Sequence, residues 1–375
     1  MSDTTLRVER SGVVYRNPRP ELRAVHTWHP SIALLPGGEL VAAFDLGQGP
    51  ESLDYRTWIS RSSDGGGSWS EPRRMFGDPP GRPTTHTVRI TALSDGLLVG
   101  LGGLLYRDDP ERGVVNPETF GYTDMDLVWL SSSDAAATWE GPHIIHAPLE
   151  GPSFEVCHAL VELPDGSWLA PTSTWKGWDG RAPEGMKAVA LVSRDGGASW
   201  PEYLTVMDGY ADGIIYFEQG LTVLADGRLL AVAWAFHESS GRSLPNRYSL
   251  SADGRTFSEP RECGLQGETA KLRTLADGRI LCLYRATDRP GLWAHVARIE
   301  GDRWVGLGDA PVWQGGEAAG PGGRMGGGGS NASELAGLKF GFPSMVETEP
   351  GKVFAVFWCQ EQCINNVRYA EIVVE

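Results

Sequence analysis

The sequence SSDGGGSW at residues 62–69 returns as SRDGGASW at residues 193–200. In such a segment the Asp carboxylate can accept backbone N–H bonds across a tight turn, a glycine takes a positive φ, and the aromatic ring covers the hairpin. Two weaker copies are present, one with Ala136 in place of a glycine and one with Phe257 in place of the tryptophan. We interpret all four segments as turns that stabilise β-hairpins and not as parts of a reaction site.

A second kind of hairpin recurs six times, at intervals of about sixty residues. Each copy has two apolar runs around a tight turn such as Asp226-Gly227, which supplies the positive φ angles that a two-residue hairpin turn requires. The copies begin at His29, His86, Phe154, Phe217, Glu268 and Phe340. Six units of four strands predict an all-β fold, a six-bladed β-propeller. We expect the strand at residues 6–15 to pair with the strand at residues 367–374 in the last blade, so that residues 1–375 form a single domain.

Composition narrows the function classes. The formal net charge of −15 opposes binding to nucleic acid or to an anionic membrane surface. Residues 1–10 hold no apolar run, and no run of eighteen apolar residues occurs, so we expect no signal peptide, no membrane span and a cytoplasmic location. Five cysteines without paired spacing predict reduced thiols and neither a metal site nor a cofactor. The oligomeric state is left open.

The two intact turns and the sixfold hairpin repeat resemble the sialidase (neuraminidase) superfamily of Asp-box, or BNR-repeat, propellers over nearly the whole chain. The resemblance implies a sialidase-like six-bladed propeller and a glycosidase. It also implies a role for Glu218, because Phe217-Glu218-Gln219 is similar to the fourth-blade motif in which a glutamate polarises the nucleophile.

The chain departs from this resemblance at other positions. Trp28 stands where the first arginine of the family's motif is expected, Gln48 falls near the second, and Phe342 aligns with the nucleophilic tyrosine. A sialidase needs arginines to clamp the sugar carboxylate and a tyrosine to attack the anomeric carbon. We therefore expect a glycosidase that is a sialidase by similarity only.

Propeller topology brings the starts of the six inner strands to one face of the ring. Glu155 and Glu218 begin the inner strands of adjacent blades, so we expect them to act together as the acid and the ionised partner of glycoside hydrolysis. The exo-arabinanase-type propellers are similar in using two glutamates. Glu268 and Asp45 are alternative partners for Glu218. Further contacts to the sugar are expected from Trp28, His29, His86, His158, Glu268, Lys271, Trp175, Phe342 and Asp45.

The leading hypothesis is an exo-acting glycoside hydrolase that takes a small oligosaccharide. One alternative is a propeller without catalytic activity that binds carbohydrate or protein. Another is a polysaccharide lyase in which a histidine is the base, although no local His-x-His spacing favours a metal. The glycine-rich segment at residues 314–338 is interpreted as a lid or as an insertion without a role, and the segment at residues 102–126 as a loop that narrows the site.

Overall fold

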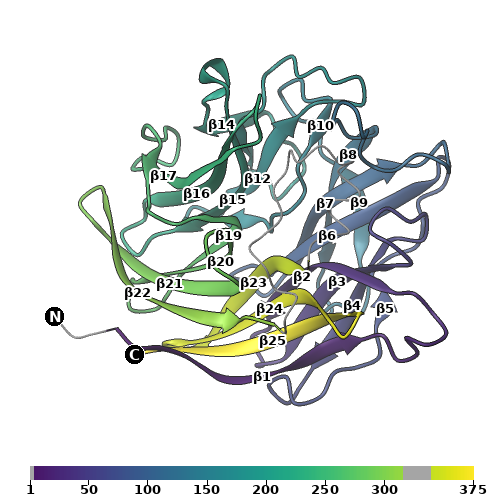
Figure 1. Cartoon of the computed structure of the whole chain (residues 1–375), viewed down its shortest axis with the longest axis horizontal. Coiled ribbons are helices and arrows are strands. Elements are labelled where there is room, and N and C mark those ends of the chain that lie inside the picture. The colour runs from purple at the N-terminus through teal and green to yellow at the C-terminus, as the bar shows by residue number, and fades with distance from the viewer. Residues whose placement is uncertain (1–3, 316–338) are drawn as a thin grey trace.

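The computed structural model describes residues 4–315 and 339–375 of the chain. Six sheets of antiparallel strands stand around a common centre, which confirms the predicted six-bladed β-propeller (Figure 1). Within the described residues the helical structure is a single 3₁₀ turn, η1 (Tyr210–Asp212). No helix in this part of the chain is long and apolar enough to cross a membrane.

Each blade is a sheet whose strands follow one another from the centre outward. The first blade consists of β2 (His26–Leu34), β3 (Leu40–Gly47), β4 (Arg56–Ser62) and β5 (Arg73–Arg74). The second consists of β6 (Thr84–Ala92), β7 (Leu98–Tyr106), β8 (Met125–Ser132) and β9 (Glu140–Ile144). The third has a divided inner strand, β10 (Ser153–Phe154) and β11 (Val161–Glu162), followed by β12 (Trp168–Trp175), β13 (Ala188–Ser193) and β14 (Glu202–Met207).

The remaining blades repeat this order. The fourth consists of β15 (Ile214–Val223), β16 (Leu229–His237), β17 (Ser243–Ser251) and β18 (Arg261–Glu262), and the fifth of β19 (Gly267–Thr274), β20 (Ile280–Ala286), β21 (Leu292–Glu300) and β22 (Arg303–Trp313). The sixth contains β23 (Phe340–Glu349), β24 (Lys352–Glu361), β25 (Ile364–Val374) and, outermost, β1 (Leu6–Arg16).

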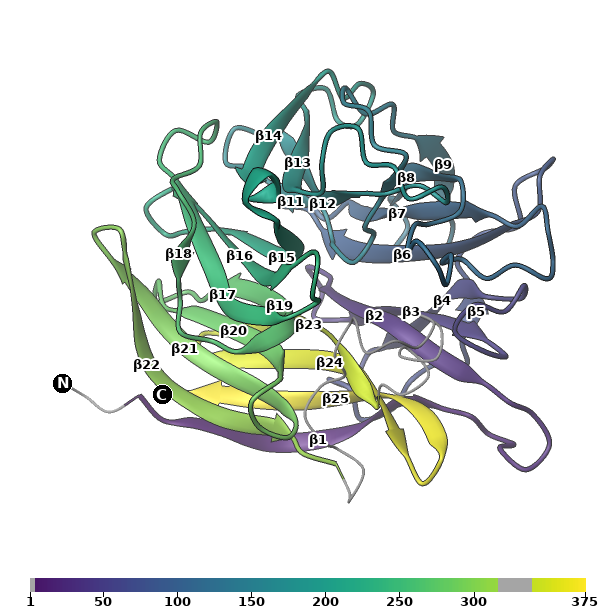
Figure 2. The ribbon, with the colours of Figure 1, turned by 45° about the horizontal axis from the view of Figure 1, so that its top comes forward.

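The two ends of the chain meet in the sixth blade. Strand β1 pairs antiparallel with β25, from Leu6 opposite Val374 to Arg16 opposite Asn366, and the two strands run side by side (Figure 2). Because the first strand completes the sheet begun by the last three, the hydrogen bonds of one blade join the two ends of the ring.

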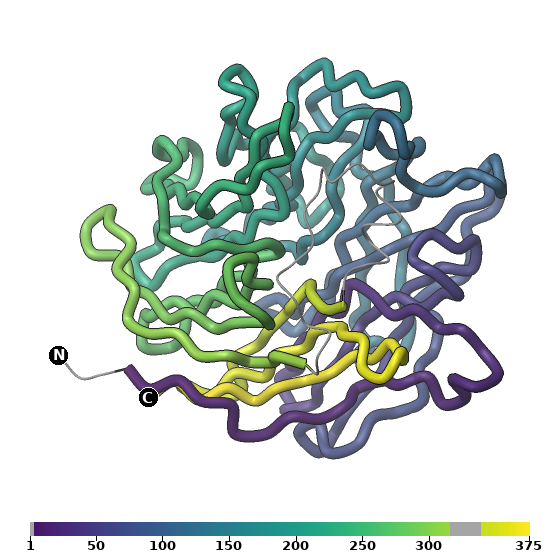
Figure 3. Tube along the Cα trace, viewed as in Figure 1, coloured from purple at the N-terminus to yellow at the C-terminus, as the bar shows by residue number. Residues whose placement is uncertain are grey.

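The core lies between neighbouring blades. The chain trace passes from blade to blade around the centre (Figure 3), so the middle strands of each blade have a neighbouring blade on both faces. Strands buried on both faces need continuous apolar runs rather than alternation. Strand β16 accordingly reads LLAVAWAFH and is buried throughout except at His237, whereas the outer strands β5 and β18 are exposed.

The Asp-containing turns lie at the outer part of the blades and share one hydrogen-bond pattern. At residues 62–69, Asp64 Oδ1 accepts from Ser68 N at 2.9 Å and Asp64 Oδ2 accepts from Ser68 Oγ at 2.6 Å, while Ser62 Oγ accepts from Gly66 N at 2.8 Å. The same contacts recur at residues 132–139 and 193–200. In the former, Ala136 takes the glycine position with a φ of 64°.

Four of the inner strands bulge at the same level of the ring. Pairing with the second strand is interrupted after Trp28, Phe217, Glu268 and Gly341. The next residue in each strand has a positive φ although it is not glycine: 43° at His29, 49° at Glu218, 54° at Thr269 and 47° at Phe342. A non-glycine residue in this region costs about 1–3 kcal/mol, and such residues concentrate at functional sites.

The turn at residues 62–69 offers a test of why glycine stands there. Gly66 has a φ of 88°, and an added Cβ would lie 2.7 Å from Phe354 Cε2; Gly65 has a φ of 67°, and its nearest contact would be Arg10 Nη2 at 3.9 Å. Gly65→Ala should cost about 1–2 kcal/mol of backbone strain, and Gly66→Ala a further 1–3 kcal/mol of overpacking. Guanidinium unfolding followed by circular dichroism measures the free energy of unfolding of both variants. Equal losses of stability in the two variants would contradict the packing argument.

Candidate functional site

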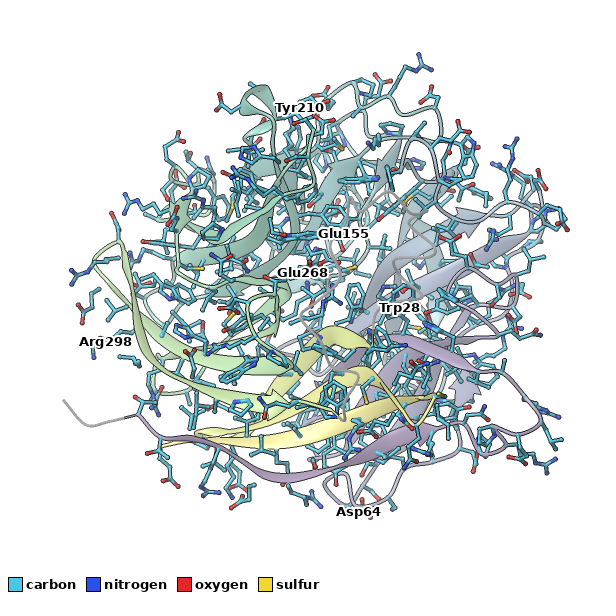
Figure 4. The ribbon with its side chains drawn as sticks, in the orientation of Figure 1. Trp28, Asp64, Glu155, Tyr210, Glu268 and Arg298 are labelled. Carbon is cyan, nitrogen blue, oxygen red and sulfur yellow. The ribbon has the colours of Figure 1, made fainter. Side chains whose placement is uncertain are left out.

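A cavity of about 150 Å³ opens at the centre of the ring, and we call it the central hollow. Figure 4 places Glu155, Glu268 and Trp28 around the centre, whereas Asp64, Tyr210 and Arg298 lie toward the periphery. Four carboxyl groups line the hollow. Glu51 comes from the loop between β3 and β4. Glu155, Glu218 and Glu268 come from blades three, four and five, as the inner-strand argument predicted.

Glu155 follows the short strand β10 and is almost completely buried, with 1% of its surface exposed. Its backbone is fixed by Glu155 N to Ser173 O at 3.0 Å and by Thr172 Oγ1 to Glu155 O at 2.6 Å. Its Oε1 accepts from Cys157 N at 2.5 Å, and its Oε2 is hydrogen-bonded to His158 Nε2.

His158 links Glu155 to a lysine from the fifth blade. The ammonium of Lys271 donates to His158 Nδ1 at 3.1 Å and to Gln219 O at 3.2 Å. Burial lowers the pKa of His158 to about 4, so the ring is neutral at pH 7. Because Nδ1 accepts from Lys271, the ring proton sits on Nε2 and is donated to Glu155.

The protonation of Glu155 follows from these neighbours. Burial alone would raise its pKa, but His158, Lys271 and the Cys157 amide outweigh this effect and lower the pKa to about 2. Glu155 is therefore ionised at neutral pH.

Glu218 lies in the bulge of β15, and its surroundings shift its pKa in the opposite direction to that of Glu155. Burial raises its pKa, nearby Arg285 opposes this, and the charges of Glu155 and Glu268 add to the rise, which reaches about 7. Glu218 Oε2 accepts from Thr269 N at 3.1 Å. The following residue anchors the bulge, because Gln219 Nε2 donates to Thr172 O at 2.7 Å and to Val189 O at 2.8 Å.

Glu268 forms a buried ion pair with Arg285. Its Oε2 accepts from Nε of Arg285 at 3.0 Å and also from Nη2, and Arg285 Nη1 donates to Phe340 O at 3.1 Å. Both residues are buried, with 2% and 4% exposed. A carboxylate held this way is a poor proton donor, so Glu268 fits a role beside the reacting pair better than within it.

His29 forms the other polar pair at the hollow. Its Nδ1 lies 3.0 Å from Asp45 Oδ2, and Asp45 also accepts from Thr57 Oγ1 at 2.7 Å and Thr87 Oγ1 at 2.6 Å. Burial lowers the pKa of His29, partly offset by the Asp45 hydrogen bond. Asp45 is completely buried and lies behind His29 rather than on the wall of the hollow.

Aromatic rings form much of the remaining wall. The Trp28 ring stacks on His29 with centroids 5.0 Å apart, and Phe342 meets His29 edge-on at 4.4 Å. Trp234 and Tyr55 also line the hollow. The loop predicted at residues 102–126 starts later, since β7 continues to Tyr106, and it supplies Val114, Val115 and Tyr122 to the wall.

The structure brings most of the predicted residues to the hollow but corrects several placements. Trp28, His29, His86, Glu155, Glu218, Glu268 and Phe342 line it. His86 is fully buried and stacks on Phe76 at 4.1 Å. Trp175 was expected in the hollow but packs behind Phe217 and donates to Phe120 O at 2.7 Å. His158 and Lys271 were also expected there but line a second cavity further along the axis.

Sequence reasoning missed several wall residues, among them Tyr55, Cys157 and Tyr122. Tyr55 and Tyr122 lie outside the hairpin repeats, and Cys157 lies within the gap between β10 and β11, where no strand register applies. Residues 316–338, the main part of the predicted glycine-rich segment, lie outside the described residues. Within the described ranges no group of three or more His, Cys, Asp or Glu side chains could hold a metal ion.

Known structures share this architecture at low sequence identity. A protein of unknown function from Dyadobacter fermentans superposes with a TM-score of 0.74 at 18% identity, covering 99% of both chains. The Hadza microbial sialidase Hz136 gives 0.65 at 14% identity, covering 96% of this chain and 68% of its own. The α-L-arabinanase of Penicillium chrysogenum, solved with arabinobiose, gives 0.64 at 15% identity, covering 98% of both chains.

No protein-family model matches the chain, and no curated protein matches it. The superpositions extend over almost all of this chain and include sialidases as well as an arabinanase. The chain therefore has the sialidase-like six-bladed β-propeller fold.

Proposed function

We propose that the protein is a glycoside hydrolase in which Glu218 is the general acid and Glu155 its ionised partner. One observation carries the proposal: both carboxyl groups line the central hollow, and their surroundings shift their pKa values in opposite directions, to about 7 and about 2. Two carboxyl groups with separated pKa values are what acid-assisted cleavage of a glycosidic bond requires.

Glu218 is suited to proton donation. With a pKa of about 7 it is protonated at mildly acidic pH and still about half protonated at neutral pH. Its Oε2 accepts from Thr269 N, and Oε1 has no hydrogen-bond partner among the described residues. A proton on Oε1 can therefore be passed to the oxygen of the leaving group as the glycosidic bond breaks.

Glu155 is suited to the other role. Its negative charge is held by N–H donors from His158 and Cys157, and Lys271 stands behind His158. An ionised carboxylate beside the anomeric carbon either attacks that carbon or removes a proton from an attacking water. In this account His158 and Lys271 are positioning residues, which act through Glu155 and do not touch the sugar.

The charged side chains on the wall of the central hollow favour a neutral sugar over an acidic one. The cationic side chains that line the hollow are Arg107 and Arg285. Arg285 is neutralised by Glu268, and Arg107 Nη2 donates to the carbonyl oxygens of Glu51 and Arg112. Arg107 Nη1 is buried without a hydrogen-bond partner among the described residues, whereas all three guanidinium nitrogens of Arg285 have partners. One free nitrogen does not make the two-bond clamp that a sugar carboxylate takes.

Several polar atoms on the wall of the central hollow could form hydrogen bonds with the hydroxyl groups of a sugar. Nε1 of Trp28, the hydroxyl of Tyr55, Nε1 of Trp234 and Oε1 of Glu268 are buried without a hydrogen-bond partner among the described residues. Buried polar groups are normally paired, so hydroxyls of a sugar ring are suitable partners. The aromatic faces beside them suit the apolar face of the ring. A chain end would enter a hollow of about 150 Å³ more readily than the middle of a polymer, which supports exo action.

The His29–Asp45 pair favours a second candidate, a polysaccharide lyase. Asp45 fixes the Nδ1–H tautomer of His29, which leaves Nε2 free to remove a proton. A lyase would release an unsaturated product with ultraviolet absorbance, whereas hydrolysis releases a new reducing end without that absorbance.

Turnover of Glu218→Gln and Glu155→Gln tests the hydrolase proposal. On the aryl glycoside or arabino-oligosaccharide that the native protein cleaves fastest, each variant should lose at least about 100-fold in kcat, because each removes a proton or charge that the transition state needs. Glu202→Gln, an exposed glutamate on β14, is the control and should keep full activity. Native turnover in both variants would sink the proposal, and an unsaturated product would point to the lyase.

The pH dependence of unfolding tests the two pKa shifts without any substrate. The pKa of Glu218 is raised from 4.5 to about 7, so ionising it costs stability as pH rises through this window. Glu218→Gln should therefore gain on the order of 3 kcal/mol relative to the native protein between pH 4 and pH 8.

Glu155→Gln should behave in the opposite way. Because the pKa of Glu155 is lowered, its ionised form stabilises the folded state above about pH 4.5, and this stabilisation is lost as the pH falls toward 2. This variant should be less stable than the native protein at pH 7, and the difference should shrink in acid. Denaturant unfolding at several pH values measures both curves; parallel curves for the two variants would refute the assignment.

A further inference from the structure

A second cavity lies on the propeller axis, beyond the bulges of the inner strands, and we call it the axial cavity. Its volume is about 410 Å³. The residues just after the bulges, Ser31, Gly220, Lys271 and Ser344, are on its wall, together with Arg89 of β6. All six blades contribute to it, and Glu155 and Glu218 are not on its wall.

Arg89 is the unusual residue of this cavity. It is 2% exposed, and its Nη1 donates to Pro30 O at 2.5 Å. Nε and Nη2 are buried and have no hydrogen-bond partner among the described residues, and Arg89 is in none of the ion pairs found there. The guanidinium carbon lies 5.5 Å from the centroid of the Phe342 ring. A buried charge without a counter-ion is costly, so a guanidinium in this position calls for a partner.

A second cation stands on the same wall. Lys271 Nζ carries three hydrogens and donates two of them, to His158 Nδ1 and to Gln219 O. Burial lowers the pKa of Lys271, and the charge of Arg89 acts in the same direction, as expected for two cations in one space. The charges of Glu155 and Glu218 act in the opposite direction on the pKa of Lys271, but neither carboxylate lies on the wall of the axial cavity, and neutral His158 adds no negative charge there.

The rest of the wall does little to offset these charges. Thr91, Thr222, Thr274 and Ser344 provide hydroxyl groups, and Arg273 adds an exposed cation toward the mouth. The carboxylate on the wall, Glu162, accepts from Ser94 N at 2.7 Å and from Ser94 Oγ at 3.0 Å. The deep end of the axial cavity is therefore positive, although the whole chain carries a formal charge of −15.

We propose that the axial cavity binds a small oxyanion, held by Arg89 and Lys271. Nε and Nη2 form one edge of the guanidinium, and that edge fits two oxygens of a carboxylate or of a tetrahedral anion with two parallel hydrogen bonds. The remaining Lys271 hydrogen supplies a third donor. Glu155 and Glu218 are not on the wall of this site, so anion binding is measured without reference to turnover, although Lys271 also positions Glu155 through His158.

Selenate is a suitable probe because it has the shape of sulfate and phosphate and scatters anomalously. Crystals of the full chain soaked in selenate should show an anomalous peak in the axial cavity within hydrogen-bond distance of Arg89 Nε and Nη2. A parallel titration calorimetry series with selenate and with formate, at constant ionic strength, separates tetrahedral anions from carboxylates as the preferred class. The crystal experiment uses the native chain and does not depend on whether a variant folds.

Arg89→Lys keeps the charge but removes the two-nitrogen edge, and it should weaken binding by about tenfold or more. Arg273→Gln is the matched control, since it removes a charge at the mouth of the same cavity and should change binding less than about threefold. Circular dichroism melting confirms that both variants are folded. An absent peak, a peak at exposed arginines only, or equal loss in both variants would overturn the proposal.

Discussion

Six inner strands converge on one axis, and the buried carboxyl groups of Glu155, Glu218 and Glu268 consequently share a small space. Three negative charges in such a space repel one another, so their protonation cannot be independent. Arg285 neutralises Glu268, and the chain of His158 and Lys271 stabilises the charge on Glu155. Glu218 lacks a comparable partner and keeps its proton. The candidate chemistry of the hollow therefore follows from the unequal distribution of a few cations around the axis.

The bulges of the inner strands give this axis its two parts. Residues before and within the bulges, such as Glu268 and Glu218, line the central hollow, and residues after them, such as Lys271 and Ser344, line the axial cavity. An extra residue in a strand shifts the alternation of side chains, which lets one short strand serve both spaces. The positive φ angles at His29, Glu218 and Phe342 are the conformational cost of that arrangement.

The ring could be predicted from sequence because its signals are local: the turn sequences and the spacing of the hairpins define the six blades. The same spacing correctly brought Glu155 and Glu218 to one hollow. The finer placement depended on strand register, which sequence does not encode residue by residue. Lys271 was expected at the sugar because it lies near a strand start, but the bulge after Glu268 places it in the axial cavity. Trp175 lies at the end of β12, where packing against Phe217 decided its position.

The central claim is that Glu218 and Glu155 differ in protonation while lining one hollow. Carbon-13 NMR of protein labelled at the glutamate carboxyl carbon measures it directly, with Glu218→Gln and Glu155→Gln identifying the two signals. The account predicts that the Glu218 carboxyl titrates near pH 7 and that the Glu155 carboxyl stays ionised down to about pH 2. Titration of both groups near the ordinary glutamate value of about 4.3 would contradict it.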